Sequence, residues 1–271
     1  MKVDGRIIAQ EIRNHLKSDI LTLKSRNIIP KIAIITLGDE SSWKSYVSQK
    51  IKVADELGIK AVLLNLADTS EEMLLKTISE IDRDPLYHGI IVQRPMPSTI
   101  SKEKVISAIS AEKDIDGFRP HSPFEVPVWL AVLRLIKESG IMNQESWKDK
   151  NFVVIGKGET AGGPIANGLS KLGVNSHVID SKTENREELL KNADVIVSCV
   201  GRREVIKPED LKEGVYLIGV GTHSEDGKLR GDYVDSAIES IAKFYTPTPG
   251  GVGPINLSYL FSNLIQAAAE I

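Results

Sequence analysis

Short runs of β-branched and aliphatic residues alternate with helical segments along most of this chain of 271 residues. In the first half the runs lie at 31–37, 61–66 and 89–93, with helical periodicity at 41–57 and 70–81. The second half repeats the scheme, with runs at 152–156, 175–180, 193–201 and 215–221 and a helical segment at 162–172. Such alternation is typical of parallel sheets covered by helices, so the sequence predicts an α/β fold.

A segment with three prolines, 119–127, separates the two halves and precedes a helical segment at 128–137. Because domain boundaries often fall in proline-rich linkers, we expect a first domain at 1–122 and a second at 123–253. The chain ends in an apolar helical segment, 254–271, which we expect to pack onto the first domain and complete it.

Composition excludes several classes of protein. The net charge of −3 leaves no basic footprint for nucleic acid. The single cysteine, Cys199, rules out an internal disulfide and argues against a cysteine-based zinc site, and we expect no metal. The N-terminal residues do not resemble a signal peptide, and no apolar run reaches the ~20 residues that cross a membrane. We therefore expect a cytoplasmic protein that does not associate with membranes.

Lys50 lies on the apolar side of the helical segment 41–57. At about 100° per residue, it shares an arc with Tyr46, Val53 and Leu57. Burial disfavours the charged form of a lysine and can bring its pKa into the range useful for proton transfer. The alternative is that the Lys50 ammonium reaches water while its aliphatic stem covers apolar surface.

Two further polar positions stand where ligands bind in α/β proteins. Gln93 ends the run 89–93, and ligands bind beyond the carboxyl ends of parallel strands. Its amide could orient a substrate or only cap backbone groups. The segment 112–118, EKDIDGF, could direct one carboxylate inward, although turn chemistry alone explains Asp-Gly. It offers too few oxygen ligands for a calcium loop.

A glycine-rich turn, GKGETAGG at 156–163, follows one apolar run and opens the helical segment 162–172. Backbone N–H groups at a helix N-terminus bind pyrophosphate, and glycines allow its close approach. The spacing is not a clean G-x-G-x-x-G, but a strand before the turn and a helix after it predict a Rossmann-type NAD(P)-binding domain.

The most specific segments are SYVSQKIKVADELGI at 45–59, GIIVQRPMP at 89–97, EKDIDGF at 112–118 and TPTPGGVGPINLSYL at 246–260. Through them the chain resembles the bifunctional methylenetetrahydrofolate dehydrogenase/methenyltetrahydrofolate cyclohydrolase family over essentially its whole length. The resemblance implies oxidation of 5,10-methylenetetrahydrofolate with NADP and hydrolysis of the 5,10-methenyl product to 10-formyltetrahydrofolate. It also implies a homodimer that serves one-carbon metabolism and purine biosynthesis.

The resemblance implies roles for individual residues. Tyr46 and Lys50 match the family's active-site tyrosine and lysine, and Lys50 would manage the protons of the hydrolysis. Gln93 matches the glutamine that supports this lysine and the folate, and Asp116 matches the residue that bonds the pterin ring. The implied cofactor residues are Gly156, Lys157, Gly158, Ser181 and Thr222. The implied substrate-binding residues are Tyr46, Asp116, Pro249, Gly250 and Gly251.

Cofactor preference is ambiguous in the sequence. Asp180 ends the run 175–180, where an acidic residue normally bonds the ribose 2′-hydroxyl and favours NAD. Against this, Lys157, Ser181 and Lys182 could meet a 2′-phosphate. The family usually has Arg-Ser where this chain has Lys157-Gly158, which removes a hydroxyl. We favour NADP because Lys157 and Ser181 remain, with NAD as the alternative.

Three other positions depart from the family's usual residues. Arg94 replaces an apolar residue after Gln93, and Gly219 stands where an aspartate is common. At the opening of the helical segment 128–137, this chain has Pro-Val-Trp-Leu at 127–130 in place of the family's Pro-Cys-Thr-Pro.

Other functions remain open. A monofunctional NAD(P)-dependent methylenetetrahydrofolate dehydrogenase would lack useful hydrolysis, and the presence of Tyr46, Lys50 and Gln93 argues against it. A non-catalytic dinucleotide-binding regulatory protein would have lost the polar residues of the first domain, which are present. A generic hydroxy-acid or amino-acid dehydrogenase explains the glycine turn but not the string PGGVGP at 249–254.

Overall fold

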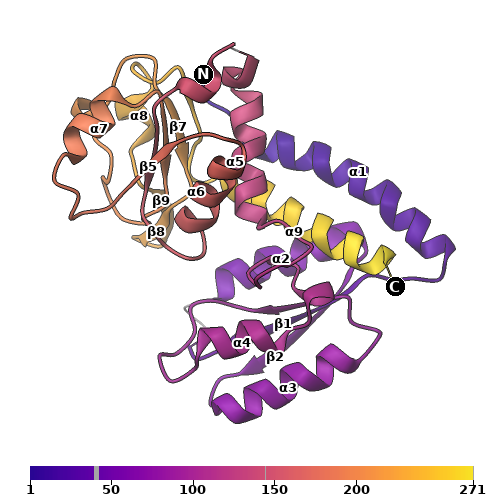
Figure 1. Cartoon of the computed structure of the whole chain (residues 1–271). Helices are drawn as coiled ribbons and strands as arrows, with labels where there is room; N and C mark the ends of the chain where they lie inside the picture. The colour runs from indigo at the N-terminus through magenta and orange to yellow at the C-terminus, as the bar shows by residue number, and fades with distance from the viewer. Residues whose placement is uncertain (40–42, 144, 271) are drawn as a thin grey trace. The chain divides into compact units, whose positions relative to one another are not determined.

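The computed structural model describes residues 1–39, 43–143 and 145–270. The chain forms two compact units (Figure 1). The first unit comprises residues 10–127 and the end of the chain from Leu257, and the second comprises residues 1–9 and 128–256. Each contains a parallel sheet with helices, so the predicted α/β class is confirmed.

The first unit contains a three-stranded parallel sheet in the order β2-β1-β3. The apolar runs of the sequence form its strands, which are β1 (Lys31–Leu37), β2 (Lys60–Leu66) and β3 (Gly89–Val92). Successive side chains point to opposite faces of a strand. Ile32 and Ile34 therefore enter one hydrophobic cluster, and Ala33 and Ile35 enter another.

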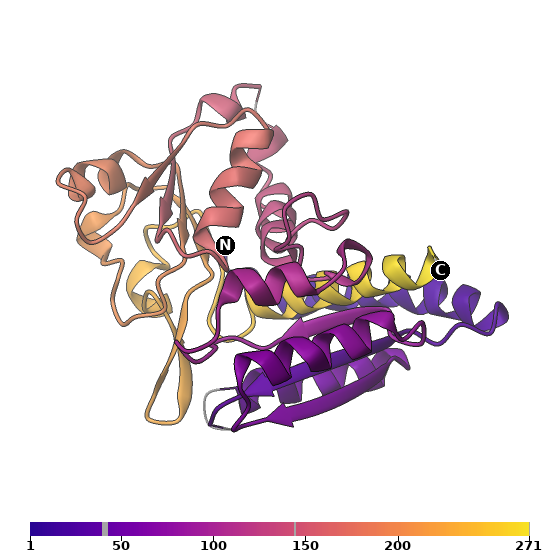
Figure 2. The same ribbon diagram turned by 60° about the horizontal axis from the view of Figure 1, so that its bottom comes forward.

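Each cluster joins one face of this sheet to helices. The first cluster includes side chains of α1 (Gly5–Ser25), α2 (Lys44–Leu57) and α9 (Val252–Ala269). The second includes side chains of α3 (Glu71–Arg83) and α4 (Lys102–Ala108). Figure 2 shows α1 and α9 running side by side. Phe261 and Leu264 of α9 are fully buried in the first cluster, so the end of the chain packs onto the strands of this unit.

The second unit contains a five-stranded parallel sheet in the order β10-β7-β6-β4-β5. Its strands are β4 (Phe152–Ile155), β5 (Ser176–Ile179), β6 (Val195–Ser198), β7 (Tyr216–Gly219) and β10 (Phe244–Tyr245). The strand order reverses at β4, because β5 lies on one side of it and β6 on the other. A reversal of this kind is where Rossmann-type sheets bind dinucleotides.

The helices of the second unit are α5 (Pro127–Glu138), α6 (Gly162–Lys171), α7 (Arg186–Asn192) and α8 (Asp235–Ile238). An antiparallel hairpin, β8 (Thr222–Glu225) and β9 (Lys228–Gly231), follows β7. Short 3₁₀ turns, including Ala111–Lys113 of the first unit, join several elements of the chain.

The structure differs from the sequence expectations mainly in short or amphipathic elements. Helix α1 and the β8–β9 hairpin were not predicted. The hairpin strands are short and polar, whereas α1 does carry a helical signal, because aliphatic residues recur at every fourth position from Ile8 to Ile20. The last helix begins at Val252, ahead of the predicted start at 254. Of the predicted helix 41–57, positions 41 and 42 lie outside the described residues. Within the described residues, no helix is both long and apolar enough to span a membrane.

Candidate active site

Three of the predicted catalytic side chains meet in the first unit. Lys50 projects from α2, Gln93 directly follows β3, and Asp116 follows the 3₁₀ turn at 111–113. The Lys50 Nζ donates a hydrogen bond of 2.6 Å to Gln93 Oε1. Gln93 Nε2 in turn donates to the Arg94 carbonyl at 2.7 Å, which holds the amide with its oxygen facing the lysine. Lys50 is thus a directed group rather than a lysine that only covers apolar surface.

Burial acts on the two charged members of this cluster in opposite ways. Burial lowers the pKa of Lys50, and the negative charge of Asp116 opposes that change. Burial raises the pKa of Asp116, and the positive charges of Lys50 and Arg94 oppose that change. A lysine whose pKa is lowered gives up its proton more readily than a solvated lysine, which favours a role in proton transfer.

Tyr46 does not share the burial that the sequence predicts for its face of α2. Its side chain is 48% exposed, whereas Val53 and Leu57 on the same predicted arc are buried. In the first turns of α2 the buried face is centred on Trp43 and Val47, so Tyr46 lies at its edge. An exposed position leaves its ring accessible to a ligand.

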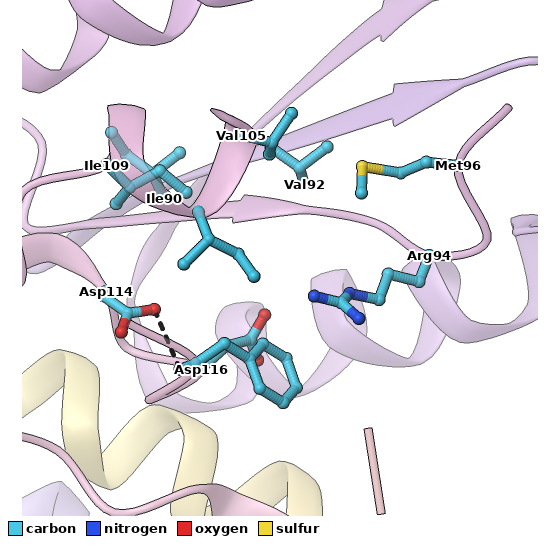
Figure 3. Close-up of a pocket in the computed structure, with 10 residues that line it drawn as sticks. Ile90, Val92, Arg94, Met96, Val105, Ile109, Asp114 and Asp116 are labelled. Atoms are coloured by element: carbon cyan, nitrogen blue, oxygen red, sulfur yellow. Dashed lines mark hydrogen bonds between the residues drawn. The ribbon is translucent and has the colours of Figure 1, made fainter. Parts of the chain in front are cut away.

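A pocket lies beside Asp116 (Figure 3). Its apolar wall comes from β3, the residues after it and α4, through Ile90, Val92, Met96, Val105 and Ile109. Its polar side chains are Arg94, Asp114 and Asp116. The guanidinium of Arg94 points toward Asp116 in this view and lies 4.6 Å from the centre of the Phe118 ring.

Asp114 is buried in the turn that leads to Asp116. Its Oδ2 accepts a hydrogen bond from the Arg119 amide at 2.8 Å, and its Oδ1 accepts from the Phe118 amide at 3.4 Å. Burial raises the pKa of Asp114 to about 6, and the negative charge of Asp116 adds to the rise. Asp114 therefore shapes the turn that carries Asp116.

Replacement of Asp114 by Asn should change how stability depends on pH. The folded-state pKa of about 6 exceeds the ordinary 3.8, so the folded chain binds this proton more tightly than the unfolded chain. The free energy of unfolding should then fall as pH rises through this window. Between pH 4 and pH 7.5, the free energy of unfolding of Asp114→Asn should rise by up to about 3 kcal/mol relative to that of the unsubstituted chain.

Denaturant unfolding at the two pH values measures this effect. Asp68→Asn, at an exposed position of the same unit, is the matched control for the removal of a carboxylate. A stability difference between Asp114→Asn and the unsubstituted chain that is the same at both pH values would contradict the assignment.

The glycine-rich turn of the second unit fits a dinucleotide. Gly156 has a φ of 99°, which favours glycine, and a Cβ on Gly162 would lie 1.9 Å from the Gly156 carbonyl oxygen. A Cβ on Gly158 would meet no atom within 4 Å, so the outer side of the turn is open. The turn leads into the N-terminus of α6, whose amides are suited to a pyrophosphate.

The polar residues predicted beside this turn lie at the ends of neighbouring strands. Lys157 Nζ forms an ion pair with Asp180 Oδ2 at 3.0 Å. The hydrogen bond from Lys157 lowers the pKa of Asp180, whose Oδ1 also accepts from the Lys182 amide at 2.9 Å. Ser181 is exposed after β5, and Thr222 begins β8. Asp180, which favours NAD, and Lys157, which favours NADP, thus form an ion pair with each other.

Asp232, which the sequence did not single out, organises the loop after β6. Its fully buried carboxylate accepts hydrogen bonds from Ser198 Oγ at 2.6 Å and from the amides of Val200, Gly201 and Arg202 at 3.0, 2.7 and 3.0 Å. A Cβ on Gly201 would lie 2.8 Å from the Thr222 carbonyl oxygen, so this loop packs on the start of β8. A buried aspartate after a hairpin has no local signature in a sequence.

The predicted substrate-binding turn at 249–251 belongs to the second unit, not to the unit that holds Lys50. Gly250 has a φ of 104°, and its carbonyl oxygen accepts a hydrogen bond of 2.8 Å from the Gly5 amide. A Cβ on Gly5 would lie 1.9 Å from the Gly251 carbonyl oxygen. The glycines at these positions therefore allow the turn to pack against the start of α1.

Comparison with known families bears on both units. Residues 3–116 match the family model for the tetrahydrofolate dehydrogenase/cyclohydrolase catalytic domain, and residues 129–271 match the model for the NAD(P)-binding domain of the same family. The chain belongs to the tetrahydrofolate dehydrogenase/cyclohydrolase family. This confirms the resemblance predicted from the sequence.

Individual members of the tetrahydrofolate dehydrogenase/cyclohydrolase family match along almost their whole length. The bifunctional protein FolD of Halalkalibacterium halodurans is 37% identical, over 99% of this chain and 98% of that protein. The crystal structure of the bifunctional enzyme FolD of Campylobacter jejuni is 31% identical with a TM-score of 0.93, covering 100% and 99% of the two chains. The enzyme of Trypanosoma brucei, solved with NADP and an inhibitor, is 27% identical with a TM-score of 0.92, covering 100% and 97%.

Two departures from the usual residues of the tetrahydrofolate dehydrogenase/cyclohydrolase family have a steric reason in this chain. A Cβ on Gly219 would lie 2.9 Å from the hydroxyl of the buried Tyr233, so Tyr233 occupies the space of a side chain there. Trp129, near the start of α5, is buried, and a Cβ on Gly168 of α6 would lie 2.2 Å from its ring. The larger residue at 129 is thus accommodated by a glycine on the facing helix.

Proposed function

We propose that this protein oxidises 5,10-methylenetetrahydrofolate to 5,10-methenyltetrahydrofolate with NADP and hydrolyses the product to 10-formyltetrahydrofolate. The observation that carries the proposal is the hydrogen-bonded pair of Lys50 and Gln93 beside Asp116, in a chain of this family. We assign the folate-binding domain to 1–122, completed by 254–271, and the NAD(P)-binding domain to 123–253.

The oxidation requires alignment more than proton transfer. A bound dinucleotide supplies the acceptor for the hydride of the methylene carbon. The residues that would hold it are Gly156, Lys157, Gly158, Ser181 and Thr222. On the substrate side, Tyr46 offers an exposed ring, Asp116 offers a carboxylate to the pterin, and the turn Pro249-Gly250-Gly251 offers backbone groups.

The hydrolysis requires protons to move, and Lys50 is placed to move them. Water adds to the methenyl carbon, the bond from this carbon to N5 breaks, and N10 keeps the formyl group. The neutral Lys50 amine takes one proton from the attacking water, and the resulting ammonium delivers it to N5 as the bond from N5 to the carbon breaks. The second proton of the water leaves to solvent as the formyl C=O forms. Gln93 Oε1, fixed 2.6 Å from the Lys50 Nζ, keeps the amine directed through both transfers.

One assay tests both activities. The protein is incubated with methylenetetrahydrofolate and each cofactor, and the formation and the decay of the methenyl product are followed. We expect formation followed by decay faster than in buffer. Formation without accelerated decay would favour the monofunctional dehydrogenase, and no formation would favour a non-catalytic dinucleotide-binding protein.

The choice of NADP rests on Lys157 and Ser181, and the complex of the Trypanosoma brucei relative with NADP supports it. The Asp180 carboxylate acts against it, because it neutralises Lys157 at 3.0 Å and would repel a 2′-phosphate. Asp180→Ser should therefore raise the ratio of kcat/KM for NADP to that for NAD about tenfold, equivalent to about 1.4 kcal/mol. The calorimetric Kd for NADP should fall relative to that for NAD.

Asp194→Ser is the matched control, because Asp194 also forms an ion pair, with Lys212 at 2.7 Å, but precedes β6 at the opposite end of the sheet. It should leave the cofactor ratio unchanged. A clear preference of the unsubstituted protein for NAD would contradict the NADP assignment, and an unchanged ratio in Asp180→Ser would contradict the role given to Asp180.

We also propose a cytoplasmic homodimer that acts in one-carbon metabolism and supports purine biosynthesis. Its partners are tetrahydrofolate derivatives, and we propose no membrane or nucleic-acid partner and no metal. Family membership supports these assignments, and the net charge of −3 agrees with the absence of a nucleic-acid partner. Light scattering coupled to gel filtration tests the dimer.

A further inference from the structure

Arg94 brings a permanent charge to the cluster at Lys50. It directly follows Gln93, lines the same pocket as Asp116, and points its guanidinium toward that carboxylate (Figure 3). The centre of the Phe118 ring lies 4.6 Å from the Arg94 guanidinium carbon, and this cation–π contact helps to hold the guanidinium in place. The family usually has an apolar residue at this position, so the charge is a departure from the usual pattern.

The charge of Asp116 is balanced by two cations of different chemistry. Both Lys50 and Arg94 favour its ionised form against the effect of burial. The lysine can lose its proton, whereas a guanidinium keeps its charge at every pH that a protein tolerates. If Lys50 were the sole counter-ion, its deprotonation would leave an uncompensated, largely desolvated carboxylate, which is costly.

We propose that Arg94 is a positioning residue that keeps Asp116 ionised when Lys50 gives up its proton, so that the amine and the carboxylate can act in their different forms at the same time. The inference rests on the proposed role of Lys50 in hydrolysis. Arg94 acts through Asp116 and is not itself a group that exchanges protons.

The charged groups around Asp116 come from several elements. Lys50 faces it from α2, Arg94 faces it from the segment after β3, and Asp114 faces it from its own turn. Glu103 of α4 lies within the field of Arg94 and lowers the net positive charge on that side. Without Arg94, Asp116 would attract the Lys50 proton more strongly, and the acidic neighbours Asp114 and Glu103 would act in the same direction.

Substitution at Arg94 should therefore move the titration of Lys50. We expect Arg94→Met, which keeps an unbranched side chain but removes the charge, to shift the acid limb of the pH profile of methenyltetrahydrofolate hydrolysis upward by about one unit. Arg94→Lys, which keeps a positive charge, should keep the acid limb close to its position in the unsubstituted protein. The KM for the folate should change less than kcat near the acid limb.

A direct measurement keeps the inference separate from the proposed function. Lysine acetylation by a limiting reagent, followed at each pH by peptide mass spectrometry, reports the midpoint at which Lys50 becomes nucleophilic. This midpoint should rise by about one unit in Arg94→Met and return in Arg94→Lys, whether or not the protein hydrolyses its proposed substrate. Arg94→Gln serves in the same way if Arg94→Met does not fold.

The outcomes are distinct. An unchanged Lys50 midpoint in Arg94→Met, or an equal loss of activity at every pH without rescue by lysine, would overturn the role of Arg94. Absence of hydrolysis in the unsubstituted protein would overturn the proposed function, while the acetylation midpoints would still decide the inference. A Lys50 acetylation midpoint that rises in Arg94→Met and returns in Arg94→Lys supports the role of Arg94.

Discussion

Lys50→Met should abolish the hydrolysis of methenyltetrahydrofolate and retain folate binding. General acid–base catalysis by one side chain typically contributes about 10²- to 10⁴-fold, so we expect kcat for hydrolysis to fall by at least about a hundredfold. Met keeps an unbranched apolar side chain but has no proton to exchange. Gln93 Oε1 also loses the Lys50 Nζ donor that lies 2.6 Å away. Decay of methenyl absorbance measures the rate, and equilibrium titration with the folate measures binding.

The matched control is Lys52→Met, because Lys52 lies on the same helix but faces solvent. It should leave hydrolysis within about a factor of two of the unsubstituted rate, since surface substitutions rarely change more than about 0.5 kcal/mol. Unchanged hydrolysis in Lys50→Met would remove Lys50 from the mechanism. A loss of hydrolysis accompanied by a loss of folate binding would place Lys50 in substrate binding instead.

Asp232→Ala should lower the free energy of unfolding by at least about 3 kcal/mol. The substitution removes the acceptor of a hydroxyl and three backbone amides, from Ser198, Val200, Gly201 and Arg202. Each buried donor left without a partner costs about 1–3 kcal/mol, although part is recovered if water enters. Denaturant unfolding measures the loss. Because the released loop follows β6 at the dinucleotide end of the sheet, the Kd for NADP should rise as well.

Asp149→Ala, at an exposed position of the same unit, is the control and should change stability by less than about 0.5 kcal/mol. A loss in Asp232→Ala no larger than that of the control would show that the loop after β6 does not depend on this carboxylate. Retained stability with weakened NADP binding would limit its role to the shape of the binding loop.

Much of the fold could be predicted because its signals are local. The run 31–37 is the strand β1 in full, and the runs at 152–156 and 162–172 differ from β4 and α6 by a residue at the end. Such segments carry their own periodicity and end at glycine or polar residues. The hairpin at 222–231 could not be predicted in the same way, because its strands are short, largely polar and contain no buried residue.

In the candidate site too, local sequence patterns predicted single residues but not the contacts between them. Lys50 and Gln93 are separated by 43 residues, and periodicity could predict only that each faces inward or ends a strand. Their contact follows from the parallel pairing of β1 with β3 and the packing of α2 on that sheet, which bring the two side chains to one edge. Tyr46 shows the reverse case, because it shares an apolar arc in the sequence yet lies exposed.

By itself, the sequence determined the α/β class, the glycine turn before α6 and, through its most specific segments, the family. These depend on residues that are close along the chain, whose conformational preferences are largely independent of the rest. Only the tertiary structure decided that Gln93 directs Lys50, that Asp180 pairs with Lys157, and that Arg94 shares Asp116 with the lysine. Those relations depend on distance and burial between segments far apart in sequence, and the charge of a group is set by its neighbours in space.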